Sequence, residues 1–251
     1  MKKTGEIQSE YKNLKEGDYE AFALEYKDDD RNAVIKMVST VKKRIEALEL
    51  EKQRMYTMFE FERKYSDYKY IAGIDEVGRG PLAGPVVAGC VILPKDCDIL
   101  YLNDSKQLSE KKREELYDII MEKAVATGIG YASPERIDEI NILQADYEAM
   151  REAIGKLNVT PDILLNDAVN IPEVDIPQVP IIKGDAKSAS IAAGSIIAKV
   201  TRDRLMVEYA KVFPEYGFDS NKGYGSATHI AAIKKYGPSI IHRKTFIKNF
   251  I

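Results

Sequence analysis

The chain has 251 residues, with 37 Lys and Arg against 40 Asp and Glu, which gives a formal net charge of −3. A hydrophobic share of 45% is ordinary for a globular protein and excludes disorder along the whole chain. No apolar run approaches the roughly 20 residues of a membrane span, the first residues lack a signal peptide's apolar core, and two cysteines are too few for a disulfide framework. We therefore expect a soluble, cytoplasmic protein with no membrane partner, and the net charge by itself argues against nucleic acid.

The charge is distributed unevenly along the chain. Residues 1–68 carry a net charge of −1, residues 69–180 carry −9 and residues 181–251 carry +7. A basic end beside an acidic middle suits a polyanionic ligand whose charge is balanced partly by protein and partly by metal. Solvated surface charge explains the same numbers equally well, so the charge distribution leaves both alternatives open.

Residues 1–68 are predicted to form a helical extension. No proline occurs before Pro81 and no glycine occurs between Gly17 and Gly73, and a stretch without these breakers favours helix. Apolar residues recur there at spacings of four and three, which predicts an amphipathic helix of several turns: Val34, Val38, Val41, Ile45, Leu48, Met55 and Phe59. A compact α/β domain is expected over residues 69–251.

Residues 69–251 combine strand-like and helical patterns. Strands are expected at residues 70–74, 86–93, 126–132, 162–165 and 179–182, where short apolar runs are bounded by turn residues. Helices are expected at residues 134–140, 144–157 and 188–212. Three early strands followed by alternating strands and helices indicate a mixed sheet covered by helices.

Four acidic residues follow the expected strands: Asp75, Glu76, Asp167 and Asp185. Ligands of open α/β sheets bind at strand ends, so these carboxylates are expected to converge. Carboxylates that close repel one another unless a cation lies among them, and hard oxygen ligands select Mg²⁺ or Mn²⁺. Two such ions would suit a phosphodiester displacement. Taken singly, each residue is more simply explained as a turn, cap or solvated residue; the four together are harder to dismiss.

Residues 73–87, GIDEVGRGPLAGPVV, resemble the opening motif of the type 2 ribonucleases H, the ribonuclease HII family. They do not form a phosphate-binding Walker loop, because no Gly-Lys-Ser/Thr follows. Further segments resemble the family in the same order along the chain: LNDSKQLS at 102–109, LLNDA at 164–168, KGDAKS at 183–188, AKVTRDR at 198–204, NKGYG at 221–225 and HRKTF at 242–246. The resemblance covers the whole α/β domain.

The resemblance implies a ribonuclease H-like fold with a mixed five-stranded sheet flanked by helices, preceded here by the N-terminal extension. It implies a monomeric endonuclease that cleaves RNA in RNA–DNA hybrids and cuts on the 5′ side of single ribonucleotides in duplex DNA. The expected products are 3′-hydroxyl and 5′-phosphate ends, and the expected roles are ribonucleotide removal from DNA and removal of primers and hybrids. By motif position, Asp75, Glu76, Asp167 and Asp185 carry two Mg²⁺ or Mn²⁺ ions and the catalysis.

The same resemblance assigns substrate contacts. Gly78, Arg79 and Gly80 match the family's reader of the ribose 2′-hydroxyl, the group that distinguishes RNA from DNA. Tyr224 matches the tyrosine that packs on the sugar beyond the scissile bond, although a turn aromatic between two glycines explains it as well. Basic residues near the motifs are candidate phosphate contacts, with Lys106 and Lys183 first; Arg243 is another, and Arg202 is more simply a helix-surface charge.

Two other hypotheses compete with this interpretation. A non-catalytic hybrid-binding module would have lost at least one of the four carboxylates, and all are present. The related type 3 enzymes share the carboxylates but lack the Gly-Arg-Gly tripeptide, and would cut a single embedded ribonucleotide weakly. For the extension, Lys42, Lys43 and Arg44 are hypothesised to help hold the duplex, although a charged helix face is usually only solvated.

Overall fold

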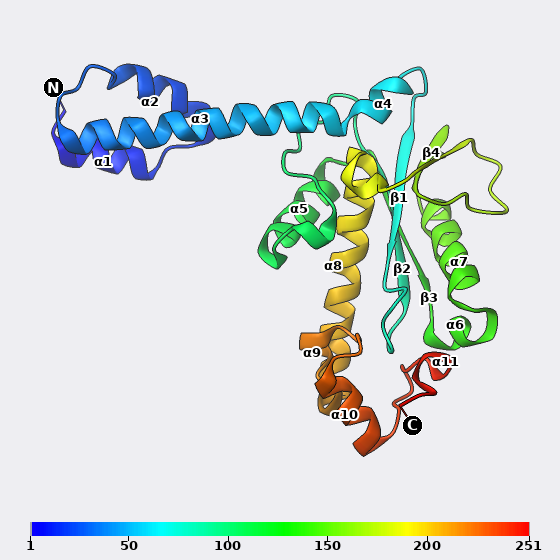
Figure 1. Cartoon of the computed structure of the whole chain (residues 1–251). Helices are drawn as coiled ribbons and strands as arrows, with labels where there is room; N and C mark the ends of the chain where they lie inside the picture. The colour runs from blue at the N-terminus through cyan, green and yellow to red at the C-terminus, as the bar shows by residue number, and fades with distance from the viewer. Residues whose placement is uncertain (1, 251) are drawn as a thin grey trace. The chain divides into compact units, whose positions relative to one another are not determined.

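The computed structural model describes residues 2–250 and divides into two compact units between Tyr56 and Thr57 (Figure 1). The division falls before residue 68 because helix α4 (Glu60–Lys64) belongs to the second unit. There Phe61 and Tyr65 pack against the buried cluster that includes Ile71 and Ile163. The functional division into residues 1–68 and 69–251 stays a prediction.

The first unit consists of helices folded on one another. Its elements are α1 (Thr4–Lys12), the 3-10 turn η1 (Glu16–Asp18), α2 (Tyr19–Glu25) and the N-terminal part of α3 (Asn32–Met58). The predicted stripe is buried where it meets the two short helices, since Val34, Val38 and Val41 form one cluster with Ile7 and Phe22. This confirms the amphipathic helix over that part of α3 and gives the unit its own small core.

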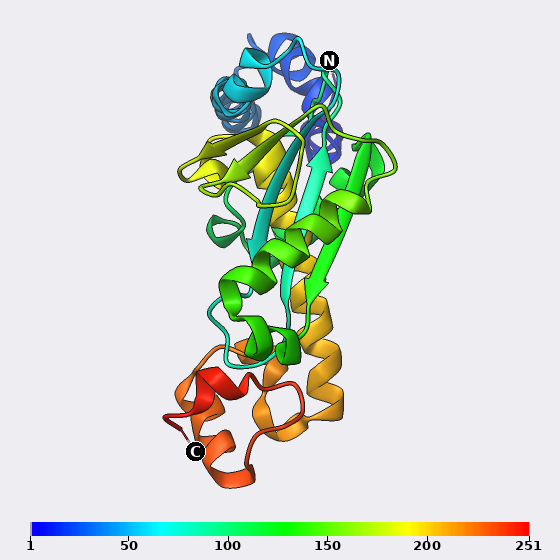
Figure 2. The same cartoon turned by 90° about the vertical axis from the view of Figure 1, so that its right-hand side faces the viewer.

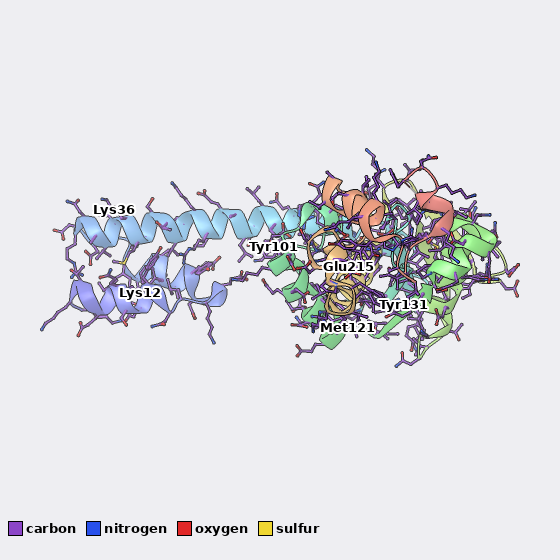
Figure 3. The ribbon with its side chains drawn as sticks, turned by 90° about the horizontal axis from the view of Figure 1, so that it is seen from below. Lys12, Lys36, Tyr101, Met121, Tyr131 and Glu215 are labelled. Atoms are coloured by element: carbon purple, nitrogen blue, oxygen red, sulfur yellow. The ribbon has the colours of Figure 1, made fainter. Side chains whose placement is uncertain are left out.

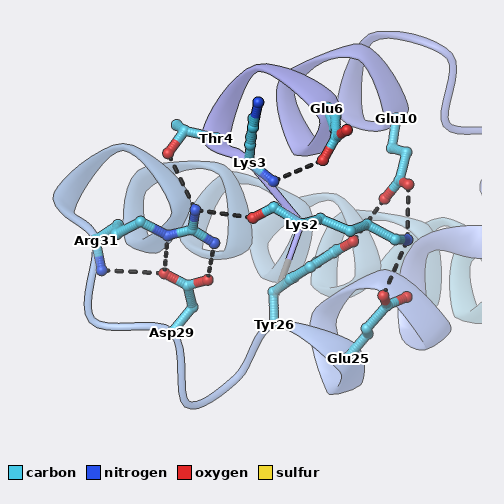
Figure 4. A network of polar contacts seen from close by, with 9 residues as sticks. All are labelled: Lys2, Lys3, Thr4, Glu6, Glu10, Glu25, Tyr26, Asp29 and Arg31. Carbon is cyan, nitrogen blue, oxygen red and sulfur yellow. Dashed lines mark hydrogen bonds and ion pairs between the residues drawn. The ribbon is translucent and has the colours of Figure 1, made fainter.

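Polar contacts link the ends of the helices in this unit (Figure 4). The Tyr26 hydroxyl donates to Glu10 at 2.6 Å, and Lys2 bridges Glu10 and Glu25. Arg31 binds the Asp29 carboxylate and the Lys2 carbonyl. Lys2 and Glu25 are exposed, and ion pairs at a protein surface contribute little to stability. Elsewhere on this unit Lys12 and Lys36 project from the helix surfaces (Figure 3).

The second unit is built on a five-stranded sheet in the order β3-β2-β1-β4-β5. Its strands are β1 (Ile71–Val77), β2 (Val86–Ile92), β3 (Ala126–Ala132), β4 (Ile163–Asp167) and β5 (Gln178–Ile181). β1, β2 and β3 pair antiparallel, whereas β4 lies parallel to β1 and β5 parallel to β4. The expected mixed five-stranded sheet is confirmed. β1 is longer than expected, because its pairing with β2 continues to Val77 opposite Val87.

Two helices cover opposite faces of the sheet (Figures 1 and 2): α7 (Ile142–Gly155) packs on β3 and β2, and α8 (Ala189–Val212) packs on β1 and β2. α8 approaches the strands closely because glycines face it. A Cβ on Gly89 would lie 2.3 Å from the Gly194 carbonyl oxygen, and one on Gly194 would lie 2.6 Å from the Gly89 carbonyl oxygen. Side chains at these positions would push helix and sheet apart.

Shorter elements complete the second unit: η2 (Ser105–Gln107), α5 (Glu110–Lys123), α6 (Pro134–Ile140), η3 (Gly184–Ala186), η4 (Pro214–Tyr216), α9 (Phe218–Asn221), α10 (Ala227–Tyr236) and α11 (Lys244–Ile247). A separate apolar cluster joins Met206 of α8 to Phe218 and Ile233, and to Leu82 from the loop after β1. The chain after α8 therefore folds back onto that loop. Within residues 2–250, no helix is long and apolar enough to cross a membrane.

Candidate active site

The four predicted carboxylates lie where the parallel strands β1, β4 and β5 have their carboxyl ends. This place is called here the carboxylate edge. Asp75 and Glu76 lie near the end of β1. Asp167 is the last residue of β4, and Asp185 lies in η3 just beyond β5. The parallel ladder between β1 and β4 ends at Ile74 opposite Asn166, so Asp75 and Asp167 are the next residues on adjacent strands. Asp167 accepts a hydrogen bond from the Gly184 amide at 2.6 Å, which brings η3 and Asp185 to the same edge.

Asp75 and Glu76 point to opposite faces of the sheet, as consecutive strand residues must. Asp75 lies on the face covered by α8, where the Ser195 hydroxyl favours its charged form and acts to lower its pKa. Glu76 lies toward Asp146 of α7, on the other. The carboxylates therefore surround the strand end rather than sharing one side of it.

Burial and mutual repulsion raise the proton affinity of this cluster. The pKa of Asp75 is raised well above its usual range by burial and by the charges of Glu76 and Asp167. Burial and Asp167 also raise the pKa of Glu76. Asp185 has its pKa raised to about 6 by burial, by Asp104 and by Asp167. Placing like charges this close in a desolvated setting costs free energy that a cation would offset.

The chemistry of this donor set suits a hard divalent ion. All four groups are carboxylates, which are the ligands that Mg²⁺ and Mn²⁺ prefer. Within residues 2–250, no three Asp, Glu, His or Cys side chains surround a single point at ligand distances. The cluster is a set of neighbouring hard oxygen donors from β1, β4 and η3.

The loop after β1, residues 78–85, is called here the GRG loop, and Arg202 and Arg243 hold it from within the protein. Arg243 donates to the carbonyls of Gly78 at 2.6 Å, Arg79 at 2.9 Å and Gly84 at 2.8 Å. Arg202 donates to the carbonyls of Pro85 at 2.9 Å and Ala83 at 3.1 Å. Left-handed backbone at Gly78, with φ of 92°, allows the turn that makes this possible.

These contacts correct the expectation for two basic residues. Arg202 and Arg243 are both fully buried, so neither is a phosphate contact and Arg202 is not a surface charge. Burial and the charge of Arg202 lower the pKa of Arg243 to about 9. Sequence patterns place both residues beside family motifs but do not show that their guanidinium groups turn inward to bind carbonyls.

Arg79 itself lies between two carboxylates. Its guanidinium is 3.6 Å from Glu76 Oε1 and 3.6 Å from Asp146 Oδ2. Asp146 was not expected in the site, because it occupies an apolar-patterned helix. It is buried, neither of its carboxylate oxygens has a hydrogen-bond partner within residues 2–250, and burial with the charge of Glu76 raises its pKa to about 8. Arg79 is thereby oriented along the carboxylate edge of the sheet.

Lys106 faces the carboxylate cluster. Burial acts to lower its pKa, but the negative charges of Asp104, Asp75 and Asp185 outweigh burial and raise it. Asp104 caps η2 by accepting from the Lys106 amide at 2.9 Å. Asp104 is therefore a further acidic neighbour of Asp185, one that the motif contained but that was not singled out as a site residue.

Lys183 has an exposed side chain and a left-handed backbone, with φ of 58°. This conformation turns the chain after β5, so that the next amide, of Gly184, reaches Asp167. Its position beside the carboxylate edge leaves the side chain accessible to a ligand, whereas its backbone helps place Asp185.

Tyr224 is exposed and lies in the segment after α9. The Leu82 amide of the GRG loop donates to the Gly223 carbonyl at 2.8 Å, which ties the tyrosine's segment to that loop. The Arg202 guanidinium lies 5.9 Å from the Tyr224 ring centroid. The GRG loop and Tyr224 are therefore neighbours in space although about 145 residues separate them along the chain.

Close relatives of the whole chain are ribonucleases HII. One from Lachnoclostridium phytofermentans is 65% identical over 247 residues, which cover 98% of this chain and 97% of the relative. One from Bacillus subtilis strain 168 is 52% identical and covers 90% of this chain and 89% of the relative. The similarity therefore includes the N-terminal unit as well as the sheet domain in the first of these.

Solved structures share the fold of the second unit. The ribonuclease H2 of Pyrococcus horikoshii OT3 superposes with a TM-score of 0.61 at 28% identity, over 72% of this chain and 96% of that one. The ribonuclease HII in a PCNA complex from Archaeoglobus fulgidus gives 0.60 at 29% identity, over 72% of this chain and 96% of that one. Bst-RNase HIII, at 17% identity with a TM-score of 0.55, shows the fold alone.

Two family models account for almost the whole sequence. The model described as Ribonuclease HII matches residues 72–249, and the model described as Ribonuclease HII N-terminal domain matches residues 3–66. The matched ranges contain the carboxylate edge, the GRG loop and Tyr224 in the first case, and helices α1 to α4 in the second. The chain belongs to the ribonuclease HII family, the type 2 ribonucleases H, and is a nuclease of the hydrolase class.

Proposed function

We propose that this chain cleaves RNA within RNA–DNA hybrids and cuts on the 5′ side of single ribonucleotides embedded in duplex DNA, leaving 3′-hydroxyl and 5′-phosphate ends. The observation that carries the proposal is the gathering of Asp75, Glu76, Asp167 and Asp185 at one sheet edge, with Arg79 of the GRG loop beside them. Membership of the ribonuclease HII family supports the substrate class. The cellular roles that follow are removal of ribonucleotides from DNA and of RNA from hybrids.

The four carboxylates would hold two divalent ions, Mg²⁺ or Mn²⁺. When bound, such ions lower the pKa of an attacking water and offset the charge of the leaving oxygen. The chain's own contribution is to keep the oxygen ligands buried and close, through the Ser195 contact to Asp75 and the Gly184 contact to Asp167. No histidine base is required at this edge, and among the described residues both histidines lie elsewhere.

The GRG loop would recognise the ribose 2′-hydroxyl. Arg202 and Arg243 fix its carbonyls, so the loop is organised before the substrate arrives and loses little conformational entropy on binding. Tyr224, exposed beside it, would pack on the sugar of the next nucleotide. Lys106 and Lys183 would contact backbone phosphates, and such contacts make affinity fall as salt concentration rises.

The decisive experiment compares two duplexes, one with a single embedded ribonucleotide and one with a long RNA–DNA hybrid, in Mg²⁺ or Mn²⁺. Asp75→Asn and Asp185→Asn should each lower the cleavage rate about a thousandfold on both substrates, since about 4 kcal/mol of transition-state stabilisation is lost. Asp96→Asn, an exposed carboxylate outside the site, is the matched control and should retain the wild-type rate. Activity within tenfold of wild type in Asp75→Asn or Asp185→Asn would contradict the assignment.

The same substrates separate the competing hypotheses. Weak cleavage of the single ribonucleotide together with strong cleavage of the hybrid would indicate a type 3 specificity. Binding of both duplexes without metal-dependent cleavage would indicate a binding module. The presence of all four carboxylates and the ordered GRG loop supports cleavage of both.

A further inference from the structure

The only two histidines of the sequence meet inside the second unit, away from the carboxylates. His229 lies in α10 and His242 lies just before α11, and their Nε2 atoms are 3.0 Å apart. Both are buried, with 0% and 3% of their surfaces exposed. The rings of Tyr216 and Phe218 pack against both histidines.

The surrounding groups determine which nitrogen carries each proton. His229 Nδ1 lies 2.8 Å from the Tyr224 carbonyl oxygen, which only accepts, so His229 carries its proton on Nδ1. His242 Nδ1 receives the Ser239 amide N–H at 2.9 Å, so that nitrogen is bare and the proton is on Nε2. The Nε2–H of His242 therefore donates to the bare Nε2 of His229.

Both rings are neutral in this arrangement. Burial lowers the pKa of His229, and burial with the neighbouring His229 lowers the pKa of His242 to about 4. The charged side chains on the surface hollow outside His242 are Glu135, Asp138, Glu139 and Lys244. The polar partners within the pocket are backbone groups and the Ser239 hydroxyl, so the proton positions are defined by neutral hydrogen bonds.

The pair connects the two segments that face the substrate in the proposed function. His229 holds the carbonyl of Tyr224. On the other side, His242 forms an antiparallel bridge with Ala83 of the GRG loop, and its neighbours extend that pairing. The Gly84 amide donates to the Ile241 carbonyl at 2.8 Å, and the Arg243 amide donates to the Leu82 carbonyl at 2.8 Å.

We propose that His229 and His242 are positioning residues for junction recognition: their hydrogen bond, together with the backbone bond from Leu82 to Gly223, sets the spacing between Tyr224 and the GRG loop. This inference rests on the proposed function. A single embedded ribonucleotide offers one 2′-hydroxyl, so the loop and the tyrosine must contact adjacent nucleotides at one fixed spacing. A long hybrid offers a 2′-hydroxyl at every RNA position and tolerates a looser spacing.

A matched pair of substitutions at His242 isolates the hydrogen bond. In His242→Gln the side-chain amide nitrogen reaches the position of Nε2 and can donate to His229. In His242→Asn the shorter amide can accept from the Ser239 amide but cannot reach His229. We expect His242→Asn to lower kcat/KM about tenfold on the single embedded ribonucleotide and less than threefold on the long hybrid. His242→Gln should recover most of the loss.

Equal losses on the two substrates, or equal behaviour of the Gln and Asn variants, would overturn the proposal and leave the pair a general support of the fold. Should His242→Asn fail to fold, His229→Asn tests the same bond from the other side. Its amide nitrogen overlays Nδ1 and keeps the bond to Tyr224, and the same substrate-selective loss is expected.

A second measurement needs neither substrate nor variant. The ¹⁵N chemical shifts of the two rings in the wild-type protein should show His229 protonated on Nδ1 and His242 on Nε2; any other pair of tautomers would overturn the proposal. If the wild-type protein does not cut the embedded ribonucleotide at all, the proposed function fails, and these shifts still report on the histidine pair.

Discussion

The carboxylate edge of the sheet and the GRG loop both bury charge, but they balance it in opposite ways. Asp75 is desolvated beside Glu76 and Asp167, and the nearby protein groups reduce the repulsion only in part. The two buried arginines behind the loop are surrounded instead by carbonyl oxygens, to which they donate. In the first region the buried charges repel one another, whereas in the second they are balanced by hydrogen bonds that hold the loop.

The largest expected effect on stability comes from removing a buried arginine. Arg243→Met would leave the carbonyls of Gly78, Arg79 and Gly84 without their donors, at a cost of about 3 kcal/mol or more. Urea denaturation should show a markedly lower midpoint. Arg204→Met, which removes an exposed ion pair with Glu114, is the control and should change stability by less than about 1 kcal/mol. Similar midpoints for both variants would show that Arg243 does not stabilise the GRG loop.

Acidification should weaken the region behind the loop. The pKa of His242 is about 4 in the folded protein, below its ordinary value, so unfolding takes up a proton and stability falls as pH drops from about 6.5 toward 4. At pH 5 the proton uptake by His242 lowers the free energy of unfolding by about 1–2 kcal/mol. The carboxylates act in the opposite direction, because their raised pKa values favour folding at lower pH.

The contribution of His242 is therefore measured as the difference in acid response between the wild-type protein and a variant without this histidine. His242→Gln, which does not titrate, should lose less stability than the wild-type protein between pH 7 and pH 5, as measured by urea midpoints at each pH. An identical acid response in the two proteins would show that His242 is not the group responsible.

Relieving repulsion at the carboxylate edge should stabilise the protein. In the absence of divalent ions, Asp75→Asn removes one buried charge beside Glu76 and Asp167 and is expected to raise the free energy of unfolding by about 1 kcal/mol. The same variant is expected to cleave about a thousandfold more slowly, so stability and activity should move in opposite directions. Asp96→Asn should change neither, and a destabilised Asp75→Asn would argue that the Ser195 contact outweighs the repulsion.

The smallest expected effect concerns the N-terminal unit. Lys42 and Lys43 are exposed on α3, whereas Arg44 already hydrogen-bonds the Tyr11 hydroxyl at 3.3 Å. If the two lysines help hold the duplex, Lys42→Glu with Lys43→Glu should raise KM a few-fold and flatten the dependence of binding on salt. Lys12→Glu with Lys36→Glu is a charge-matched control in the same unit, and an equal response to both pairs would point to net charge alone.

These substitutions test the unit better than a deletion of residues 1–68 would. Such a deletion also removes Glu62, which accepts from the Ser188 hydroxyl at 2.7 Å and from the Ser190 amide at 2.8 Å. Those contacts fix the start of α8 within the second unit. A weaker enzyme after that deletion would therefore not show that the N-terminal unit binds the duplex.

Much of the fold, and the candidate site residues, could be predicted from the sequence alone. Apolar runs and breakers predicted the five strands and helices α3, α6, α7 and α8, but not α5, because backbone periodicity follows local residue patterns and α5 carries a weak one. Asp75, Glu76, Asp167 and Asp185 were predicted as site residues from the motifs and their positions along the strands, and the structure brings them to one end of the sheet. The net charge of −3 was misleading as a guide to partners, since the site depends on local charge and not on the sum.

Only the tertiary structure showed what lies behind the site. Arg202 and Arg243 read as surface cations in the sequence, yet long-range folding buries them against the GRG loop. Asp146 and the two histidines are likewise defined by contacts with residues far away in the chain. Local sequence patterns show which face of a helix or strand is apolar. The hydrogen-bond partner of a buried polar group depends instead on how the elements pack together, so it is defined only in the tertiary structure.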